Sequence, residues 1–337
     1  MARKKKTKKK TSLPKKLKRL LIMLVILIII FLILCLITPS SDTANGITAD
    51  GSIKNLELPA PIDGEQIISH TGYTLSYNEE YELPSWVAYT LTRDEVLGTG
   101  SREDDFREDP LVRTGSASLS DYRGSGYDRG HMAPAADFKW SVEAMSDTFY
   151  LSNMCPQEPS FNRGIWADLE AVVRTMAYDN GEVHVVTGPV LTDGPYETIG
   201  KNEVAIPKQF YKVVLDYTDP DIKAIGFVLP NEGSDKALQS YAMSIDEVEE
   251  ITGIDFYPSL PDDQEEAIES KANTADWNFT EFIPTGEMPD ESQFEYVSPS
   301  SPKDMVLNEI ISLFVDIKTE VFSLLGIEEI ASSFGLI

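Results

Sequence analysis

The segment YDRGHMAPAADF, residues Tyr127–Phe138, contains one of only three histidines in the 337-residue chain. His131 follows Gly130 directly and stands two positions after Arg129. An imidazole can remove a proton from water near neutral pH, and a guanidinium is a planar fork that matches a phosphate. The segment therefore predicts a general base beside an anion-binding group.

Arginine is concentrated around this segment. Seven of the eight arginines after residue 41 lie between Arg102 and Arg174, and the last 163 residues contain none. The same stretch contains Asn153, Asn162 and Glu170, whose side-chain oxygens are of the kind that a hard cation binds. Together these residues form a consistent set for phosphodiester hydrolysis. The histidine takes a proton from water, while a cation and arginine stabilise negative charge on the phosphate and the leaving oxygen.

Several of these residues also have a purely structural interpretation. Asn162 can cap the helix that follows it, and Glu170 can be a solvated helix residue. His70 beside TGYTLSYN and His184 inside VHVV are predicted to be structural. Cys155 is predicted to be a small buried residue, because nothing in the sequence places a base beside it.

The elements that must position these residues follow from the hydrophobic pattern. Strands are predicted in TLSYN, WVAYTLT, EVHVVTGPV, YKVVLDY and KAIGFVLP, which combine apolar alternation with β-branched and aromatic residues. GIWADLEAVVRTMA, residues 164–177, has apolar residues at helical spacing. A second helix is predicted to start at Ser244, since Glu247 three residues later completes a capping box. The globular domain is predicted to span residues 61–262, after a polar linker at 38–60.

The charge distribution excludes one mode of binding. Eleven of the 29 Lys and Arg lie in residues 1–19, which leaves 18 basic residues against 55 acidic ones in the rest of the chain. Such a body has no broad cationic face for nucleic acid. Any anion must be bound by a few aimed cations or a metal, so a small, locally positive site is expected.

The amino terminus has the pattern of a membrane anchor. Residues 20–37 are 18 residues without a charge, Gly or Pro, close to the roughly 20 that a helix needs to cross a bilayer. All the flanking positive charge precedes them, which favours a cytoplasmic N terminus and a domain outside the cell membrane. A cleaved signal peptide is the alternative, but its apolar region is usually about 7–15 residues long. An uncleaved signal anchor is therefore predicted at 20–37, behind a basic cytoplasmic segment at 1–19. No disulfide is expected, because Cys35 lies in the apolar run and Cys155 in mid-chain.

The carboxyl-terminal part changes in composition. Residues 263–302 are acidic and contain Pro and Ser, which predicts a linker or a loosely packed extension. Residues 303–337 contain one apolar helical stripe, from Val306 to Leu325. This helix is predicted to dock on the domain or to mediate self-association.

Four motifs resemble one known family. DRGH at residues 128–131, the downstream NMCPQ and FNRGIWADLE, and the later VVTGP are similar in type and order to the DNA/RNA non-specific endonucleases, which carry a ββα-metal site. A four-residue motif alone arises by chance, but the ordered set is specific. The resemblance covers roughly residues 70–260. It implies an α+β fold with a central antiparallel sheet, helices packed on it and a ββα-metal finger. It also implies a metal-dependent nuclease that acts on DNA and/or RNA without reading sequence.

The resemblance implies a role for each matching position. His131 corresponds to the general base, and Arg129 to an arginine that supports binding of the scissile phosphate. Asn162 corresponds to the side-chain ligand of one Mg²⁺, with Mn²⁺ as the alternative ion, and water supplies most other ligands. Glu170, two turns along what is expected to be the same helix, would hold a metal-bound water. Asn153 would orient His131.

The loop SREDDFREDP resembles a family segment with an arginine before an aromatic residue and an Asp-Pro pair. Arg102 and Arg107 both fit. In an extended loop Arg102 and Phe106 share one side and Arg107 takes the other. Because Phe106 is expected to point inward, Arg102 is predicted to stabilise the transition state.

Two other functions fit the same residues. The chain could be an inactive nucleic-acid-binding or scaffold protein on the same fold, or a phosphodiesterase for a smaller substrate. The presence of His131, Asn162 and Glu170 together favours an active enzyme.

Overall fold

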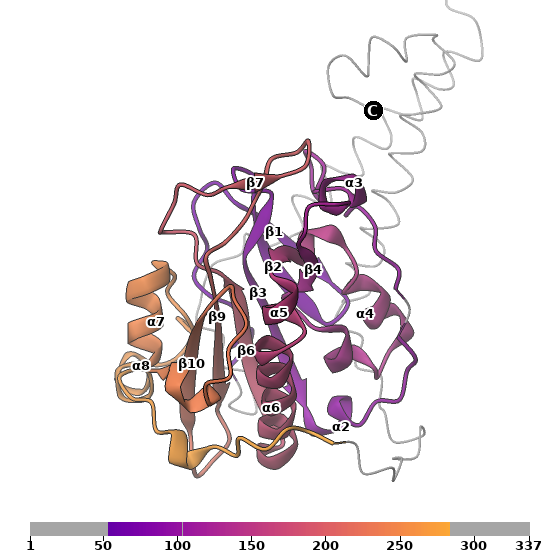
Figure 1. Cartoon of the computed structure of the whole chain (residues 1–337). Coiled ribbons are helices and arrows are strands. Elements are labelled where there is room, and N and C mark those ends of the chain that lie inside the picture. Colours follow the sequence, from indigo (N-terminus) through magenta and orange to yellow (C-terminus); the bar gives the residue numbers. More distant parts are fainter. Residues whose placement is uncertain (1–52, 103, 284–337) are drawn as a thin grey trace, which may run out of the picture. The chain divides into compact units, whose positions relative to one another are not determined.

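The computed structural model describes residues 53–102 and 104–283. Its centre is a seven-stranded sheet in the order β1-β2-β3-β6-β9-β10-β11, in which every neighbouring pair is antiparallel (Figure 1). The strands are β1 (Gln66–His70), β2 (Tyr73–Asn78), β3 (Leu83–Thr92), β6 (Glu182–Pro189), β9 (Gln209–Asp216), β10 (Lys223–Pro230) and β11 (Ala242–Met243). Two small antiparallel pairs stand apart from it, β4 (Asp128–His131) with β5 (Met154–Gln157) and β7 (Thr198–Ile199) with β8 (Val204–Ala205). The predicted α+β class with a central antiparallel sheet is confirmed.

The helices are short except for one. They are α2 (Arg93–Val96), α3 (Leu119–Tyr122), α4 (Val142–Asp147), α5 (Pro159–Asn162), α6 (Ile165–Asn180), α7 (Ile245–Thr252) and α8 (Asp262–Glu269). In residues 53–102 and 104–283, four 3₁₀ turns lie at Ala135–Phe138, Leu151–Asn153, Leu238–Tyr241 and Thr274–Asp276. The longest helix of the described residues, α6, contains residues 165–177 of the predicted segment 164–177, and its apolar stripe is buried in the core.

The sheet is covered on both faces, as β9 demonstrates. Phe210 packs its ring 5.8 Å from Trp166 of α6, while Tyr211, on the opposite face, packs 5.5 Å from Phe256. Gly226 of β10 lies on the same face as Tyr211, and a Cβ there would come within 2.5 Å of Val248 in α7. Helices α6 and α7 therefore pack on opposite faces of the sheet.

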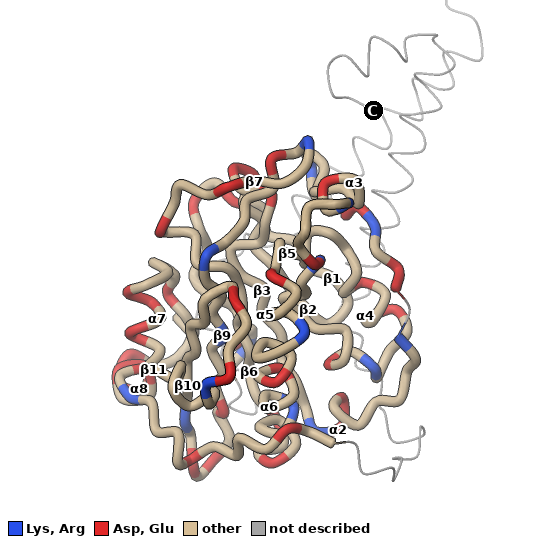
Figure 2. Tube along the Cα trace, in the orientation of Figure 1, with Lys and Arg blue, Asp and Glu red and all other residues tan. Residues whose placement is uncertain are grey.

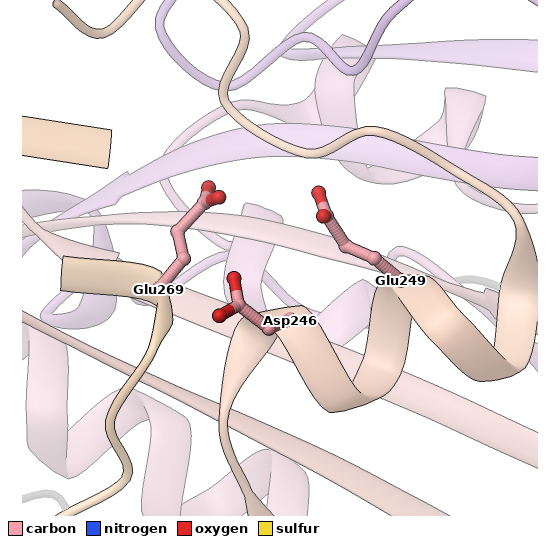
Figure 3. Close-up of side chains that lie close together, drawn as sticks. All are labelled: Asp246, Glu249 and Glu269. Carbon is pink, nitrogen blue, oxygen red and sulfur yellow. The ribbon is translucent and has the colours of Figure 1, made fainter. Parts of the chain in front are cut away.

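Helix α7 begins as predicted. The Ser244 hydroxyl accepts the backbone N–H of Glu247, and the Glu247 carboxylate accepts the backbone N–H of Ser244 at 2.8 Å. Acidic residues follow one another along α7 (Figure 2), and two of them face a glutamate of α8 (Figure 3).

The packed domain continues past residue 262. Trp277 is only 6% exposed, and the backbone N–H of Phe282 donates to the Ala171 carbonyl of α6 at 3.1 Å. The Thr175 hydroxyl of α6 donates to the Thr280 carbonyl at 2.7 Å. Residues 263–283 therefore belong to the domain and not to the predicted acidic linker.

The terminal predictions lie outside the described residues. These are the basic segment 1–19, the apolar run 20–37, most of the linker 38–60 and the apolar stripe within 303–337. In the part of the chain that the structure describes, no helix combines the length and apolar composition needed to cross a membrane.

Candidate active site

The site is built on the β4–β5 pair and the helix that follows it. Gly130 of β4 lies opposite Cys155 of β5. A Cβ at Gly130 would lie 2.0 Å from the side-chain oxygen of Gln157, which is fully buried. Only glycine fits between Arg129 and His131 without displacing that side chain.

An open cavity of about 600 Å³ lies beside β4. Five of the six predicted site residues line it, namely Arg102, Arg129, His131, Asn162 and Glu170. The segments that supply them are far apart in the sequence: the loop before Phe106, strand β4 and helices α5 and α6. The sixth predicted residue, Asn153, does not line the cavity.

His131 is held between aromatic rings and is 8% exposed. The ring centroids of Phe106 and Phe149 lie 5.6 and 5.0 Å from its own. Burial, followed by the positive charges of Arg102 and Arg129, lowers the pKa of His131 to about 3. The imidazole is therefore neutral at physiological pH.

Asn162 does not cap the long helix. It is the last residue of α5, and Gly164 occupies the N-cap position of α6 without a side-chain hydrogen bond. The interpretation of Asn162 as a cap is therefore wrong. Glu170 also does not share a helix with Asn162, because α5 ends at Asn162 and α6 begins at Ile165.

The Asn162 side chain is oriented by Asp128 instead. Its amide nitrogen donates to Asp128 Oδ2 at 3.0 Å. Asp128 also accepts two hydrogen bonds from Arg163, at 2.7 and 2.6 Å. Burial raises the pKa of Asp128, but these hydrogen bonds outweigh it and lower the pKa overall, so Asp128 is ionised. With the amide nitrogen held in this way, the Asn162 amide oxygen remains as an acceptor at the cavity wall.

Replacing Asp128 with alanine should weaken the use of a divalent ion. The Asn162 amide would lose the partner that fixes its orientation, and losing such a support typically costs about 10–100-fold in metal affinity. The measurement is the affinity for Mg²⁺ in a calorimetric titration. Asp168→Ala, an exposed position on α6, is the control. An unchanged Mg²⁺ affinity in Asp128→Ala would show that Asn162 needs no such support.

Glu170 is half-buried on the cavity wall, and an unexpected lysine lies behind it. Burial raises the pKa of Glu170, while the positive charges of Lys212 and Arg174 oppose the shift. Lys212 is fully buried, and its Nζ lies 4.9 Å from the ring centroid of Trp166, one helical turn before Glu170. Within residues 53–102 and 104–283 this Nζ has no hydrogen-bond partner. The signal in the sequence was the single lysine in the apolar strand YKVVLDY.

Asn153 supports the backbone next to His131, and none of its side-chain hydrogen bonds goes to the imidazole. Its amide nitrogen donates to the carbonyls of Ala133 and Thr148 at 3.0 and 2.8 Å, and its amide oxygen accepts the Ala133 N–H at 2.9 Å. The residue therefore fixes the chain two positions after His131.

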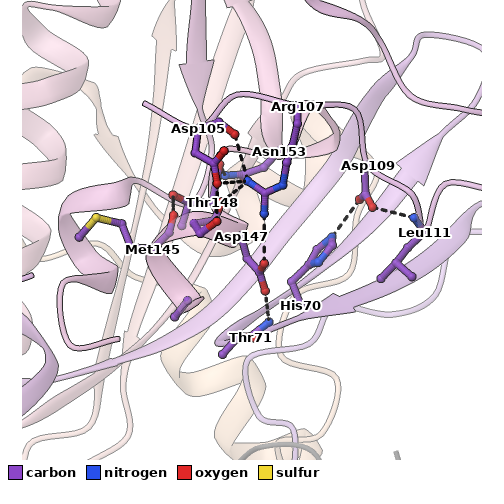
Figure 4. A network of polar contacts seen from close by, with 12 residues as sticks. His70, Thr71, Asp105, Arg107, Asp109, Leu111, Met145, Asp147, Thr148 and Asn153 are labelled. Atoms are coloured by element: carbon purple, nitrogen blue, oxygen red, sulfur yellow. Dashed lines mark hydrogen bonds and ion pairs between the residues drawn. The ribbon is translucent and has the colours of Figure 1, made fainter. Parts of the chain in front are cut away.

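The two candidate arginines of the loop have different surroundings. Arg102 lines the cavity, and its side chain is 54% exposed. Arg107 lies outside the cavity lining and is engaged in a separate network (Figure 4). Its guanidinium donates to Asp105 at 2.7 Å and to the Ser146 carbonyl at 2.9 Å, and it stacks 3.8 Å over Tyr150.

The remaining histidines and the described cysteine are packed away from the cavity. His70 Nε2 lies 2.9 Å from Asp109, and His184 Nδ1 lies 3.0 Å from the Thr90 hydroxyl. Cys155 is buried and free, and burial raises the pKa of its thiol. These positions fit the structural interpretation.

Comparisons with known proteins agree with this geometry. Residues 51–263 match the family model described as DNA/RNA non-specific endonuclease. The chain is 40% identical over 220 residues to the mitochondrial nuclease EXOG of Danio rerio, an alignment that covers 60% of this chain and 64% of that protein. It is 39% identical over 209 residues to the mitochondrial endonuclease G of Homo sapiens, with 58% and 70% covered. Nuclease C1 of Cunninghamella echinulata var. echinulata is 37% identical over 221 residues, with 61% and 88% covered.

A solved structure gives the same result. A chain in the crystal structure of the EndoG/EndoGI complex superposes with a TM-score of 0.54 at 35% identity, covering 58% of this chain and 86% of that one. The chain spans 64% of the zebrafish nuclease, slightly less than two thirds, and larger shares of human endonuclease G and nuclease C1. Because the family model covers most of the chain, including every residue of the cavity, this protein belongs to the DNA/RNA non-specific endonuclease family.

Proposed function

We propose that this protein is a divalent-metal-dependent endonuclease that hydrolyses phosphodiester bonds of DNA and/or RNA without reading their sequence. The observation that carries the proposal is the cavity itself. It places a neutral histidine, two arginines of the predicted set and an oriented amide oxygen around one space.

In this proposal His131 takes the proton from the attacking water. The water oxygen forms a bond to phosphorus as the bond from phosphorus to the leaving oxygen breaks, and the leaving oxygen takes a proton from solvent. Arg129 would bind the phosphate. Its guanidinium lines the cavity and lies 4.0 Å over the Phe106 ring, which holds it in place. Among the described residues Arg129 forms no ion pair, so its donors remain available to a phosphate.

The residues at the cavity wall fit a divalent ion. Asn162 would hold it through the amide oxygen, and Glu170 would hold a water of its coordination sphere. These are hard oxygen donors, which Mg²⁺ prefers, and Mn²⁺ is the alternative ion. Such an ion supplies positive charge that stabilises the phosphate oxygens during the reaction.

The charge of the cavity gives the ion a further role. Three arginines and three acidic residues line it: Arg102, Arg129, Arg163, Asp104, Asp128 and Glu170. Burial raises the pKa of Glu170 to about 7, so this group is only partly ionised at neutral pH and the side chains of the described lining carry little net charge. A divalent ion would make the cavity attractive to a polyanion despite the acidic body.

Incubation of the full-length protein with supercoiled plasmid DNA and with RNA tests the proposal. Cleavage is expected with Mg²⁺ or Mn²⁺ and should stop in EDTA. No cleavage of either polymer would favour the inactive binding or scaffold protein. Cleavage of small diesters alone would favour the phosphodiesterase for a smaller substrate.

We also propose that the domain lies outside the cell membrane, anchored by residues 20–37, as in a membrane-anchored bacterial nuclease. The support is the charge pattern of residues 1–37 alone, since the relatives named above are animal and fungal proteins. Protease added to intact cells should remove the domain. Digestion only after lysis would contradict this topology.

Residues 303–337 are proposed to dock on the domain or to mediate self-association. The support is the apolar stripe in their sequence. Deleting residues 300–337 should leave nuclease activity in place and, for self-association, reduce the oligomer seen by light scattering. Loss of activity from a folded truncation would place this segment in the catalytic unit.

A further inference from the structure

Three carboxylates converge on the side of the sheet opposite α6. Asp246 and Glu249 lie three residues apart on α7, and Glu269 ends α8. One carboxylate oxygen of each residue lies within 4.8 Å of the others. Figure 3 shows the three side chains pointing toward one another.

Glu269 is the unusual member of this cluster. The residue is 3% exposed, and its Oε1 has no hydrogen-bond partner within the described residues. A buried carboxylate without a partner is costly to ionise. Glu249 is fixed beside it, because its Oε1 accepts the backbone N–H of Phe256 at 2.7 Å.

The surroundings add negative charge. None of the ion pairs found in residues 53–102 and 104–283 involves Asp246, Glu249 or Glu269. Burial, followed by the nearby carboxylates of Glu249 and Glu265, raises the pKa of Glu269 to about 9. The cluster therefore gathers acidic groups, and the described part of the chain supplies no basic side chain in contact with them.

We propose that Asp246, Glu249 and Glu269 bind a Ca²⁺ ion that joins α7 to α8. Ca²⁺–oxygen bonds are roughly 2.4 Å long, so two oxygens that share one ion are at most about 4.8 Å apart, and each pair of these carboxylates meets that limit. Ca²⁺ is favoured over Mg²⁺ because it accepts flexible geometry and several protein carboxylates, whereas Mg²⁺ demands a near-ideal octahedron and retains its waters. Asp246 is exposed, which leaves room for water on the solvent side.

The consequence is structural and does not depend on the proposed nuclease activity. Residues 270–283 follow α8 directly and end in hydrogen bonds to α6. An ion that fixes Glu269 to α7 would therefore anchor the start of this closing segment. The site is distinct from the catalytic cavity, which contains none of its residues.

The test is the thermal unfolding midpoint of the full-length protein in EGTA and with added Ca²⁺. A ligand that binds only the folded state stabilises it by mass action, so saturating Ca²⁺ should raise the midpoint by about 5 °C or more. The same rise should occur in Asn162→Ala, which lacks the proposed catalytic ligand. Glu269→Gln should abolish the rise, whereas Glu266→Gln, at an exposed position of α8, should retain it.

The midpoints in EGTA show whether the variant is folded. Glu269→Gln replaces a buried unpartnered carboxylate with a neutral amide, so its midpoint in EGTA should equal or exceed that of the unmodified protein. If it unfolds instead, the exposed Asp246→Asn replaces it and should weaken Ca²⁺ binding at least about 10-fold. No rise with millimolar Ca²⁺, a full rise in these variants, or an equal rise with Mg²⁺ at the same concentration would overturn the proposal.

Discussion

Replacing His131 with alanine is expected to lower kcat for DNA cleavage at least about 100-fold while the domain remains folded. The imidazole is the neutral base of the cavity, and its ring is clamped between Phe106 and Phe149. The measurement is the initial rate on one linear DNA substrate at saturating Mg²⁺, together with the unfolding midpoint. A variant that cleaves at the normal rate would show that another group takes the proton.

The pH dependence provides a second check on His131. Its folded pKa of about 3 lies below the ordinary value of 6.5, so the base stays deprotonated well below neutral pH. Folding stability should fall as pH decreases from about 6.5 toward 3, because only the unfolded chain binds the proton in that range. This part of the acid destabilisation should be absent in His131→Ala, as measured by urea unfolding at several pH values.

Arg102→Lys is expected to lower turnover strongly, by about 100-fold or more. The substitution keeps the charge but removes the planar fork that can bind two phosphate oxygens. The guanidinium of Arg102 is half-exposed at the cavity and lies 5.2 Å over the Phe149 ring. The measurement is kcat on the same linear DNA at saturating Mg²⁺.

Arg107→Lys is the matched comparison. Arg107 binds Asp105 and the Ser146 carbonyl and stacks on Tyr150, so its replacement should lower the unfolding midpoint with little change in kcat. The reverse pattern, with turnover lost in Arg107→Lys and kept in Arg102→Lys, would assign the transition-state role to Arg107.

The sheet and the long helix could be predicted because their signals are local. Alternation in segments such as YKVVLDY and helical spacing in residues 164–177 reflect which side chains each element buries. The break between α5 and α6 could not be predicted this way. An asparagine before a helix usually caps it, but Asp128, 34 residues away, provides a competing partner for Asn162.

Part of the site could also be predicted from local sequence signals. Arg129 and His131 share a strand, so their proximity follows from the sequence. The role of Asp128 toward Asn162 and the position of Lys212 behind Glu170 depend on contacts between distant segments. The packing of residues 263–283 was missed because their acidic composition masked the few apolar residues, such as Trp277, that the fold buries.

The attachment of residues 280–283 to α6 has a mechanical consequence. The last described residues are attached to the helix that carries Glu170, through the hydrogen bonds at Ala171 and Thr175 and the packing of Phe282 on Tyr178. Force applied at residue 283 would therefore load these contacts before it reached the sheet. A pulling experiment with a handle attached at residue 283 should detach this short segment first and should bring the load next to one wall of the cavity.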